Sequence, residues 1–220
     1  MKEFIIAVDG PAGSGKSTIA KKIAKKYNFT YLDTGAMYRM VTLYFIQNNT
    51  NVNDLKNIND ILDKISLDIK EDKFFLNGQD VTALIRTPEV SSKVSEISAI
   101  KEVRAKLVVQ QRNISKGKKV ILDGRDIGTV VFPNAQMKIF LIASPEERAK
   151  RRYKEYLEKG INQKYKDVLA DIKARDIIDS TRKESPLKKA KDAMEIDSSF
   201  MSIEQVVNEI ATHIDKTISN

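Results

Sequence analysis

Residues 4–18 read FIIAVDGPAGSGKST, and the expected fold follows from them. The apolar run from Phe4 to Val8 ends at an aspartate and a glycine-rich turn, so its length and its boundary predict a buried strand rather than a helix. From Ser17 to Tyr27, isoleucine and alanine recur on one face and lysines gather largely on the other, which is typical of an amphipathic helix. The sequence therefore predicts a strand, a glycine turn and a helix in succession.

Residues 10–17, GPAGSGKS, match the phosphate-binding P-loop pattern G-x-x-x-x-G-K-[ST] in the context that the pattern requires. Glycines let successive N–H groups point at phosphate oxygens, and the helix adds the positive end of its dipole. We expect Lys16 to reach the β and γ phosphates of ATP and Ser17 to coordinate magnesium. A turn that binds nothing is the alternative, and the complete pattern argues against it. The predicted ATP site consists of Gly10, Pro11, Ala12, Gly13, Ser14, Gly15, Lys16, Ser17 and Thr18.

Magnesium needs a second oxygen ligand near the end of a neighbouring strand. Residues 120–123, VILD, supply an apolar strand that ends in the carboxylate of Asp123, as the Walker B pattern requires. Many buried strands end in aspartate because of the turn that follows, so this signal gains weight only beside the P-loop. We expect Ser17 and Asp123 to hold the metal.

Further strand-like segments alternate with helical patterns along the chain. They cover residues 30–32, 120–122, 138–142 and 194–196. Such alternation favours the α/β class, with a parallel sheet covered by helices on both faces. Ser144 precedes Pro145 and two acidic residues, and we expect it to cap a helix. We expect Ser202 to open the last helix.

The alternation of strand-like and helical segments is interrupted between residues 49 and 98. Asn-rich linkers lead to a short helix near residues 58–65, and residues 67–81 predict small antiparallel strands, with Asn77-Gly78 as a strong hairpin signal. Thr87, Pro88 and Glu89 predict the start of another helix. We interpret this stretch as an insert in the parallel core.

The composition excludes several classes of protein. The 220 residues include no cysteine, which rules out disulfides and thiolate metal sites, and the single histidine, His213, cannot build a zinc site alone. The first residues lack the apolar length of an export signal, and no apolar run is long enough to span a bilayer. We therefore expect a cytoplasmic protein without a membrane partner.

The net charge of +8 permits two interpretations. A basic surface attracts nucleic acid, or it concentrates small phosphorylated substrates. The charge alone does not choose between them. Whether the partner is nucleic acid or a small phosphorylated substrate depends on whether the arginines fall within recognisable motifs.

The sequence resembles the nucleoside monophosphate kinases, and among them the bacterial cytidylate kinases, over essentially its whole length. The motifs that carry the resemblance follow the family order, and they are DGPAGSGKST (9–18), LDTGAMYR (32–39), IRTPEVSSKVS (85–95), LDGRDIGTVVFP (122–133) and ARDIIDSTR (174–182). The resemblance implies phosphoryl transfer from ATP to CMP and dCMP, directly, in line and with Mg²⁺. The expected partners are these small-molecule substrates, without nucleic acid or a membrane, and we expect a monomer.

The resemblance also implies the architecture. The expected fold is that of P-loop NTPases, with a five-stranded parallel sheet in the order 2-3-1-4-5 flanked by helices. Residues 1–36 and 99–220 would form the kinase core, with a short lid at about 150–166. Residues 37–98 would form an α+β insert that binds the monophosphate and carries a small antiparallel sheet.

Arg39 lies about one turn into the helix that LDTGAMYR opens. Its planar guanidinium can hold two phosphate oxygens at once, so we expect a phosphate clamp, although an exposed helix arginine is the alternative. Thr34 and Tyr38 of the same motif are assigned to CMP through the resemblance.

Base recognition is implied by the family's GRD segment. There Arg125 would bind phosphate and Asp126 would read the cytosine edge together with Ser95 and Arg104. An aspartate suits cytosine because the exocyclic amine is a donor, whereas uracil presents a carbonyl that faces a carboxylate unfavourably. We expect a preference for CMP over UMP.

In ARDIIDSTR the residues Arg175, Asp179 and Arg182 follow the spacing i, i+4, i+7, which places them along one helix face. Spacing alone suggests a solvated ion-pair stripe. Through the resemblance, Arg175 and Asp179 would hold the ribose of CMP and Arg182 would reach the phosphates.

The segment ERAKRRYKEYLEKG, residues 147–160, looks like the lid of this kinase class. It carries Arg148, Arg151 and Arg152, and the sequence does not reveal which of them acts. The arginines of such lids stabilise charge on the transferring group. Our predicted catalytic set is Lys16, Arg125, Arg148, Arg152 and Arg182.

Two rival functions stay open at this stage. Another small-molecule P-loop kinase would not require an aspartate aimed at a base. A basic nucleic-acid-binding ATPase would require stacking aromatic residues or a recognition motif, neither of which we find.

Overall fold

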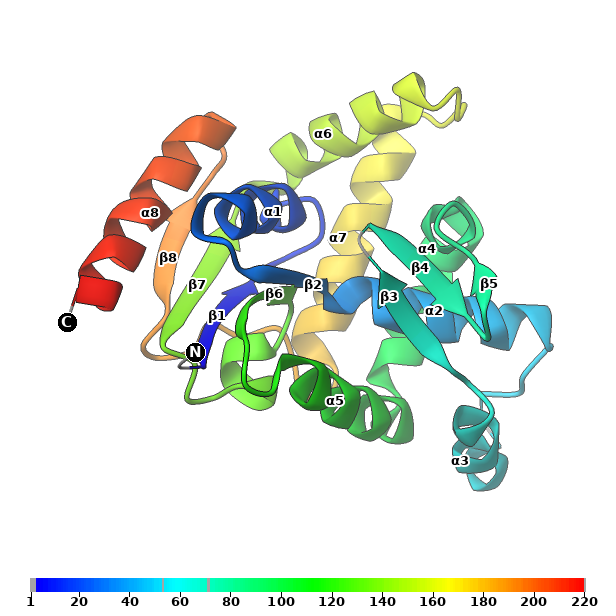
Figure 1. The fold of residues 1–220 in the computed structure, drawn as a ribbon. Helices are drawn as coiled ribbons and strands as arrows, with labels where there is room; N and C mark the ends of the chain where they lie inside the picture. The colour runs from blue at the N-terminus through cyan, green and yellow to red at the C-terminus, as the bar shows by residue number, and fades with distance from the viewer. Residues whose placement is uncertain (1–2, 53, 71, 220) are drawn as a thin grey trace. The chain divides into compact units, whose positions relative to one another are not determined.

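The computed structural model describes residues 3–52, 54–70 and 72–219. The chain divides into two compact units, one of residues 1–33 and 115–220 and the other of residues 34–114 (Figure 1). The first unit contains the P-loop and the parallel sheet. The second contains a smaller antiparallel sheet and its helices.

The sheet of the first unit is parallel throughout. Its strands are β1 (Phe4–Asp9), β2 (Thr30–Asp33), β6 (Lys119–Gly124), β7 (Met137–Ile142) and β8 (Met194–Asp197). They are arranged in the order β2-β6-β1-β7-β8, which becomes 2-3-1-4-5 when these strands alone are numbered along the chain. The predicted fold is confirmed.

The position of β1 explains why phosphate chemistry belongs at its end. β1 pairs with β6 on one side and with β7 on the other. The strand order reverses at this point, and in open α/β sheets ligands bind beyond the carboxyl ends of the strands at such a reversal. The P-loop follows β1 directly.

One apolar core joins this sheet to α1 (Lys16–Tyr27) and α8 (Ile203–Ser219). Ile6 and Ile139 of the sheet pack in one cluster with Ile23 of α1 and Ile210 of α8, and all four are fully buried or nearly so. Figure 1 shows α8 in red beside β8 and β7. Full burial of one such side chain contributes about 1.5–3 kcal/mol.

A second helix pair completes this unit. α6 (Pro145–Glu158) packs against α7 (Tyr165–Thr181) through Ala149, Val168 and Ile172 (Figure 1). The Ser144 hydroxyl accepts the N–H of Glu147 at 3.2 Å, as predicted for an N-cap.

The last helix begins with a reciprocal cap. The Ser202 hydroxyl accepts the N–H of Gln205 at 3.2 Å, while Oε1 of Gln205 accepts the N–H of Ser202 at 2.7 Å. The prediction that Ser202 opens this helix is confirmed. His213 lies on its exposed side.

The second unit begins with α2 (Thr34–Gln47), which packs on α4 (Pro88–Ala99). Between them lie α3 (Leu55–Asp63), the strands β3 (Leu67–Lys70), β4 (Lys73–Leu76) and β5 (Gln79–Asp80), and a 3₁₀ turn (Leu84–Arg86). Asn77 and Gly78 join β4 to β5 with φ of 50° and 83°, the conformation of a two-residue hairpin turn. The small antiparallel sheet and its hairpin are therefore as predicted.

The bounds of the second unit differ from the predicted insert of residues 37–98. The unit also takes in most of α5 (Lys101–Ser115), a helix that we did not predict. Arg104 of α5 lies 5.3 Å over the Tyr38 ring and donates to the carbonyl of Ser98 at 2.9 Å. These contacts tie α5 to its unit. That the unit binds the monophosphate, and that residues 150–166 form a lid, remain predictions.

None of the helices in the described ranges combines the length and the apolar character that crossing a membrane requires.

Candidate active site

The P-loop backbone requires glycine. Gly10 and Gly15 have φ of 151° and 95°, which side chains of L-residues rarely permit. A Cβ on Gly10 would collide with the carbonyl oxygen of Leu141. The loop between these glycines is therefore free to turn its N–H groups inward, as a phosphate cradle must.

Lys16 is buried against the loop. Its ammonium donates to the carbonyl of Pro11 at 2.6 Å and to the hydroxyl of Ser14 at 3.4 Å. Burial, together with the positive charge of Arg125, holds the pKa of Lys16 well below its ordinary value. An anion placed here would offset both effects, so the site favours a negatively charged ligand.

The predicted metal residues lie together. The Ser17 hydroxyl donates to Oδ2 of Asp123 at 2.8 Å, and Tyr31 donates to Oδ1 of the same carboxylate at 2.7 Å. Burial and the neighbouring charge of Asp33 raise the pKa of Asp123 to about 6. Asp33 and Asp123 are register partners in β2 and β6, which explains why both reach this edge.

The donor set around Ser17 and Asp123 fits a magnesium ion that binds together with phosphate. Among the described residues no group of three or more histidine, cysteine or acidic side chains gathers, so a cage built wholly from protein is absent there. Mg²⁺ usually takes one or two protein oxygens and completes its shell with water and phosphate. One hydroxyl and one carboxylate beside a phosphate cradle fit that requirement.

Two arginines of α6 support the P-loop from outside. Arg148 is buried, pairs with both oxygens of Asp176 at 2.9 and 2.5 Å, and donates to the carbonyl of Ala12 at 3.2 Å. Arg151 donates to the carbonyl of Ser14 at 3.4 Å and to that of Ser198 at 2.6 Å. These bonds fix the outer side of the loop.

The third predicted lid arginine, Arg152, has its contacts along its own helix. Its Nε lies 3.6 Å from Glu155, and its guanidinium lies 5.9 Å from the centre of the Tyr156 ring. The contacts of α6 with the P-loop come from Arg148 and Arg151. These contacts distinguish the positions of the three arginines, and the catalytic roles of Arg148 and Arg152 stay predictions.

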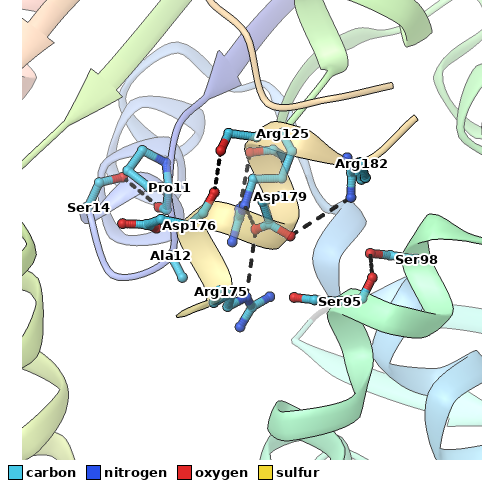
Figure 2. A network of polar contacts seen from close by, with 12 residues as sticks. Pro11, Ala12, Ser14, Ser95, Ser98, Arg125, Arg175, Asp176, Asp179 and Arg182 are labelled. Carbon is cyan, nitrogen blue, oxygen red and sulfur yellow. Dashed lines mark hydrogen bonds and ion pairs between the residues drawn. The ribbon is translucent and has the colours of Figure 1, made fainter. Parts of the chain in front are cut away.

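Three guanidinium groups surround Asp179 of α7 (Figure 2). Nε of Arg125 donates to Oδ2 at 3.0 Å, Nε of Arg175 lies 3.7 Å from the same oxygen, and Nη1 of Arg182 lies 3.9 Å from Oδ1. Burial opposes ionisation of Asp179, but the three positive charges outweigh it and hold the pKa of its carboxyl below the ordinary value. The cluster carries excess positive charge, which suits a phosphorylated ligand.

One detail of this cluster differs from the prediction. Arg182 does not share a helix face with Arg175 and Asp179, because α7 ends at Thr181 and Arg182 continues in an extended conformation. Its guanidinium donates to the carbonyl of Ser185 at 2.7 and 2.9 Å, which directs it back towards Asp179. Arg182 and Asp179 therefore still form an ion pair, although they do not share a helix face.

The predicted acceptor residues of the second unit gather on α2, α4 and α5. Arg39 donates from Nη1 to the carbonyl of Ile85 at 3.2 Å and to the hydroxyl of Ser91 at 2.9 Å. The Ser95 hydroxyl is buried and meets no hydrogen-bond partner in the described part of the chain. Such a group is costly unless a ligand or water satisfies it.

The other residues predicted to bind CMP are buried. Thr34 and Arg104 are buried, and Tyr38 is buried under the guanidinium of Arg104. Asp126 is buried in the first unit, just after β6. Thr18, by contrast, is exposed at the start of α1.

Comparison with known proteins decides the family. The model of the cytidylate kinase family matches residues 6–216 of this chain. The cytidylate kinase of Fusobacterium nucleatum is 60% identical over 98% of this chain and 99% of its own length. That of Clostridium acetobutylicum is 51% identical over 97% of this chain and 98% of its own.

The chain belongs to the cytidylate kinase family. The resemblance stated from its motifs is confirmed. Among solved structures, an uncharacterized protein from Eubacterium ventriosum is similar over 97% of this chain and 99% of its own, with a TM-score of 0.50 and 14% identity. At that identity the likeness concerns the fold alone.

Several residues of this cytidylate kinase family member lie at the site without having been predicted there. Tyr31 and Asp176 each orient a predicted residue. Arg151, which the sequence placed among the lid arginines but not in the catalytic set, touches the P-loop. Asp9 lies at the end of β1 and bonds the segment after Asp126. Its sequence signal was its place inside the DGPAGSGKST motif.

Proposed function

We propose that this member of the cytidylate kinase family transfers the γ-phosphoryl group of ATP to CMP and dCMP, giving ADP and CDP or dCDP. One observation carries the proposal. β1 and β6 are parallel neighbours that end side by side, with Asp9 opposite Gly124. The P-loop with Lys16 follows β1, and Arg125, which bonds Asp179 at 3.0 Å, follows β6. Two cationic sites, one for a donor phosphate and one for an acceptor phosphate, are thus neighbours within one unit.

The donor side follows from the P-loop. Its N–H groups and Lys16 would hold the β and γ phosphates of ATP. Ser17 and Asp123 would hold Mg²⁺, which supplies charge neutralisation on the phosphate oxygens when bound. The lowered pKa of Lys16 favours an anion beside its ammonium, and the raised pKa of Asp123 favours a cation beside its carboxylate.

The acceptor side follows from the arginines. Arg125 and Arg182 would bind the phosphate of CMP, and Arg175 with Asp179 would bind its ribose. Arg39, Thr34 and Tyr38 would add contacts from the second unit. The attacking oxygen belongs to a phosphate that is already an anion, so the reaction needs positioning and charge stabilisation rather than a strong base.

Selection of cytosine would rest on Asp126, helped by Ser95 and Arg104. The buried hydroxyl of Ser95, which meets no partner among the described residues, supports this assignment because a base edge would satisfy it. The carboxylate of Asp126 would accept the exocyclic amine of cytosine. We expect this chemistry to occur in the cytoplasm and on small nucleotides.

The test is a coupled assay of ATP turnover with a panel of acceptors: CMP, dCMP, UMP, AMP, GMP, dTMP and several sugars and hydroxy acids. We expect CMP and dCMP to give the largest kcat/KM. The variant Asp126→Ala should lose preference for CMP over UMP while the KM for ATP changes little. Stimulation by a sugar or acid without stimulation by CMP would overturn the proposal, and retained selectivity in Asp126→Ala would overturn the role of that residue.

A further inference from the structure

The segment that follows Asp126 forms an unusual turn. Residues 127–131, IGTVV, form a π-helical turn in which the carbonyl of Asp126 accepts the N–H of Val130 at 2.8 Å and that of Val131 at 3.1 Å. π-helical turns are rare and recur at functional sites. Asp126 therefore stands at the head of a rare local structure whose first N–H groups need acceptors from outside the turn.

The carboxylate of Asp9 holds the start of this turn. Its Oδ1 accepts the N–H of Ile127 at 2.8 Å, and its Oδ2 accepts the N–H of Gly128 at 2.7 Å. N–H groups at the start of a helical turn have no partner within the turn, so Asp9 supplies the missing acceptors from a different strand. The side chain is only 4% exposed, and water does not compete for these bonds.

The approach of Asp9 depends on a glycine. A Cβ on Gly128 would lie 3.3 Å from Oδ2 of Asp9 and 3.1 Å from Cδ of Lys138, tighter than side chains normally pack. A Cβ at position 128 would require the carboxylate of Asp9 or the side chain of Lys138 to move by a few tenths of an ångström. Gly128 of the LDGRDIGTVVFP motif thus leaves room for the carboxylate of Asp9 to reach the backbone of the turn.

A different group holds the far end of the segment. The ammonium of Lys138 donates to the carbonyl of Pro133 at 2.5 Å and pairs with Asp192 at 2.8 Å. The far end is anchored by a partly exposed ion pair, whereas the end beside Asp126 is anchored by a buried carboxylate. Asp9 also immediately precedes Gly10, the first residue of the P-loop.

We propose that Asp9 is a positioning residue for nucleobase selection, which fixes the backbone that carries Asp126 and links it to the strand that carries the P-loop. The inference rests on the proposed role of Asp126 in reading cytosine. Asp9 bonds the two residues directly after Asp126, so loss of either bond lets the aspartate drift relative to the base. Selectivity should respond more than ATP binding does.

The experiment compares kcat/KM for CMP and UMP, and KM for ATP, in wild type, Asp9→Asn, Asp9→Ala and Asp126→Ala. Asparagine keeps one acceptor oxygen and alanine keeps none. We expect the CMP to UMP ratio to fall about fivefold to tenfold in Asp9→Asn and further in Asp9→Ala, the size that one or two lost hydrogen bonds imply. The KM for ATP should change less than the KM for CMP.

Two more variants separate positioning from general damage. Gly128→Ala leaves Asp9 intact but crowds its bonds, and it should shift the ratio in the same direction. Asp192→Asn weakens the anchor at the far end of the segment, and it should leave the ratio within about twofold of wild type. Thermal unfolding of each variant identifies those that fold, and Gly128→Ala keeps the test open if the Asp9 variants do not.

Two outcomes would overturn the inference. The first is an unchanged CMP to UMP ratio in folded Asp9→Asn or Gly128→Ala while Asp126→Ala loses it, which would leave the proposed function standing. The second is an equal rise in KM for ATP and CMP, which would make Asp9 a support of the P-loop alone. If Asp126→Ala itself keeps its selectivity, the role of Asp126 falls, and the inference about Asp9 falls with it.

Discussion

The hydroxyl of Ser17 lies 2.8 Å from Oδ2 of Asp123, although the two residues are far apart in the chain. Ser17 is the last residue of the P-loop and lies at the start of α1, and Asp123 is near the end of β6. Because β1 and β6 are parallel neighbours, their carboxyl ends meet at one edge of the sheet. The hydrogen bond marks the place where we expect Mg²⁺, with both groups already within reach of one ion.

Replacing Asp123 with asparagine should weaken the response to magnesium. The amide carries no charge, so the concentration of Mg²⁺ that gives half-maximal activity should rise at least about tenfold and kcat should fall about a hundredfold or more. Tyr31→Phe is the matched control, because it removes the other hydrogen bond to the carboxyl and keeps its charge. Protection from thermal unfolding by Mg²⁺ with ADP gives a second measurement. An unchanged magnesium response in Asp123→Asn would exclude this carboxylate as a ligand.

Lys16→Met should abolish most turnover and spare the fold. Methionine fills similar volume, and burial disfavours the charged ammonium, which is why the pKa of Lys16 is lowered. The carbonyl of Pro11 loses the bond from Lys16 but keeps the hydroxyl of Ser14 as a donor at 3.1 Å. We expect kcat to fall by about 10²–10³, as for other preorganised charge-stabilising groups. Lys25→Met, on the exposed face of α1, is the control and should behave as wild type. Full activity in Lys16→Met would contradict the P-loop assignment.

Much of the donor site could be predicted because it depends on a short continuous stretch. The conformation of residues 10–17 is set locally by glycine, and Asp123 follows from the rule that parallel strands end at one edge. The apolar runs at Phe4–Asp9 and Met137–Ile142 also predict buried strands without knowledge of their partners.

Other features could not be predicted, since distant residues impose them. The sequence IGTVV at 127–131 is rich in β-branched residues and has the composition of a strand, yet it forms a π-helical turn held by Asp9. The pair of Arg148 and Asp176 joins two helices and follows no periodic spacing. In α5, the buried polar Gln111 interrupts the apolar pattern by which a helix is recognised.

The contacts of Arg148 predict a strong effect on stability. Its side chain is 3% exposed and pairs with both oxygens of Asp176, so Arg148→Ala leaves an unpaired carboxylate beside the P-loop. Breaking a buried pair costs about 3–5 kcal/mol of unfolding free energy. Arg152→Ala, with its partly exposed pair to Glu155, should cost less than about 1 kcal/mol. Denaturant unfolding of both variants measures the difference, and equal stability of the two would contradict the structural role of Arg148.

Asp9 predicts a specific dependence of stability on pH. Burial raises the pKa of its carboxyl from 3.8 to about 7; the N–H groups of Gly128 and Ile127 oppose the rise, the charge of Asp126 adds to it and that of Lys16 opposes it. Between these two values the native state retains a proton that the unfolded chain has lost. The carboxylate form, in which both oxygens accept the N–H groups of Ile127 and Gly128, prevails above about pH 7. The contribution of Asp9 to the free energy of unfolding therefore decreases as pH rises from about 4 to 7, by on the order of 4 kcal/mol, and is constant above.

The variant Asp9→Asn isolates this effect because asparagine does not titrate, while every other group is common to both proteins. The difference in unfolding free energy, wild type minus variant, should fall steadily from pH 5 to pH 7 and level off at pH 8. Denaturant titrations at each pH measure it. A difference that stays constant from pH 5 to pH 8 would mean that Asp9 is ionised throughout, in which case its bonds to Ile127 and Gly128 outweigh the cost of its burial.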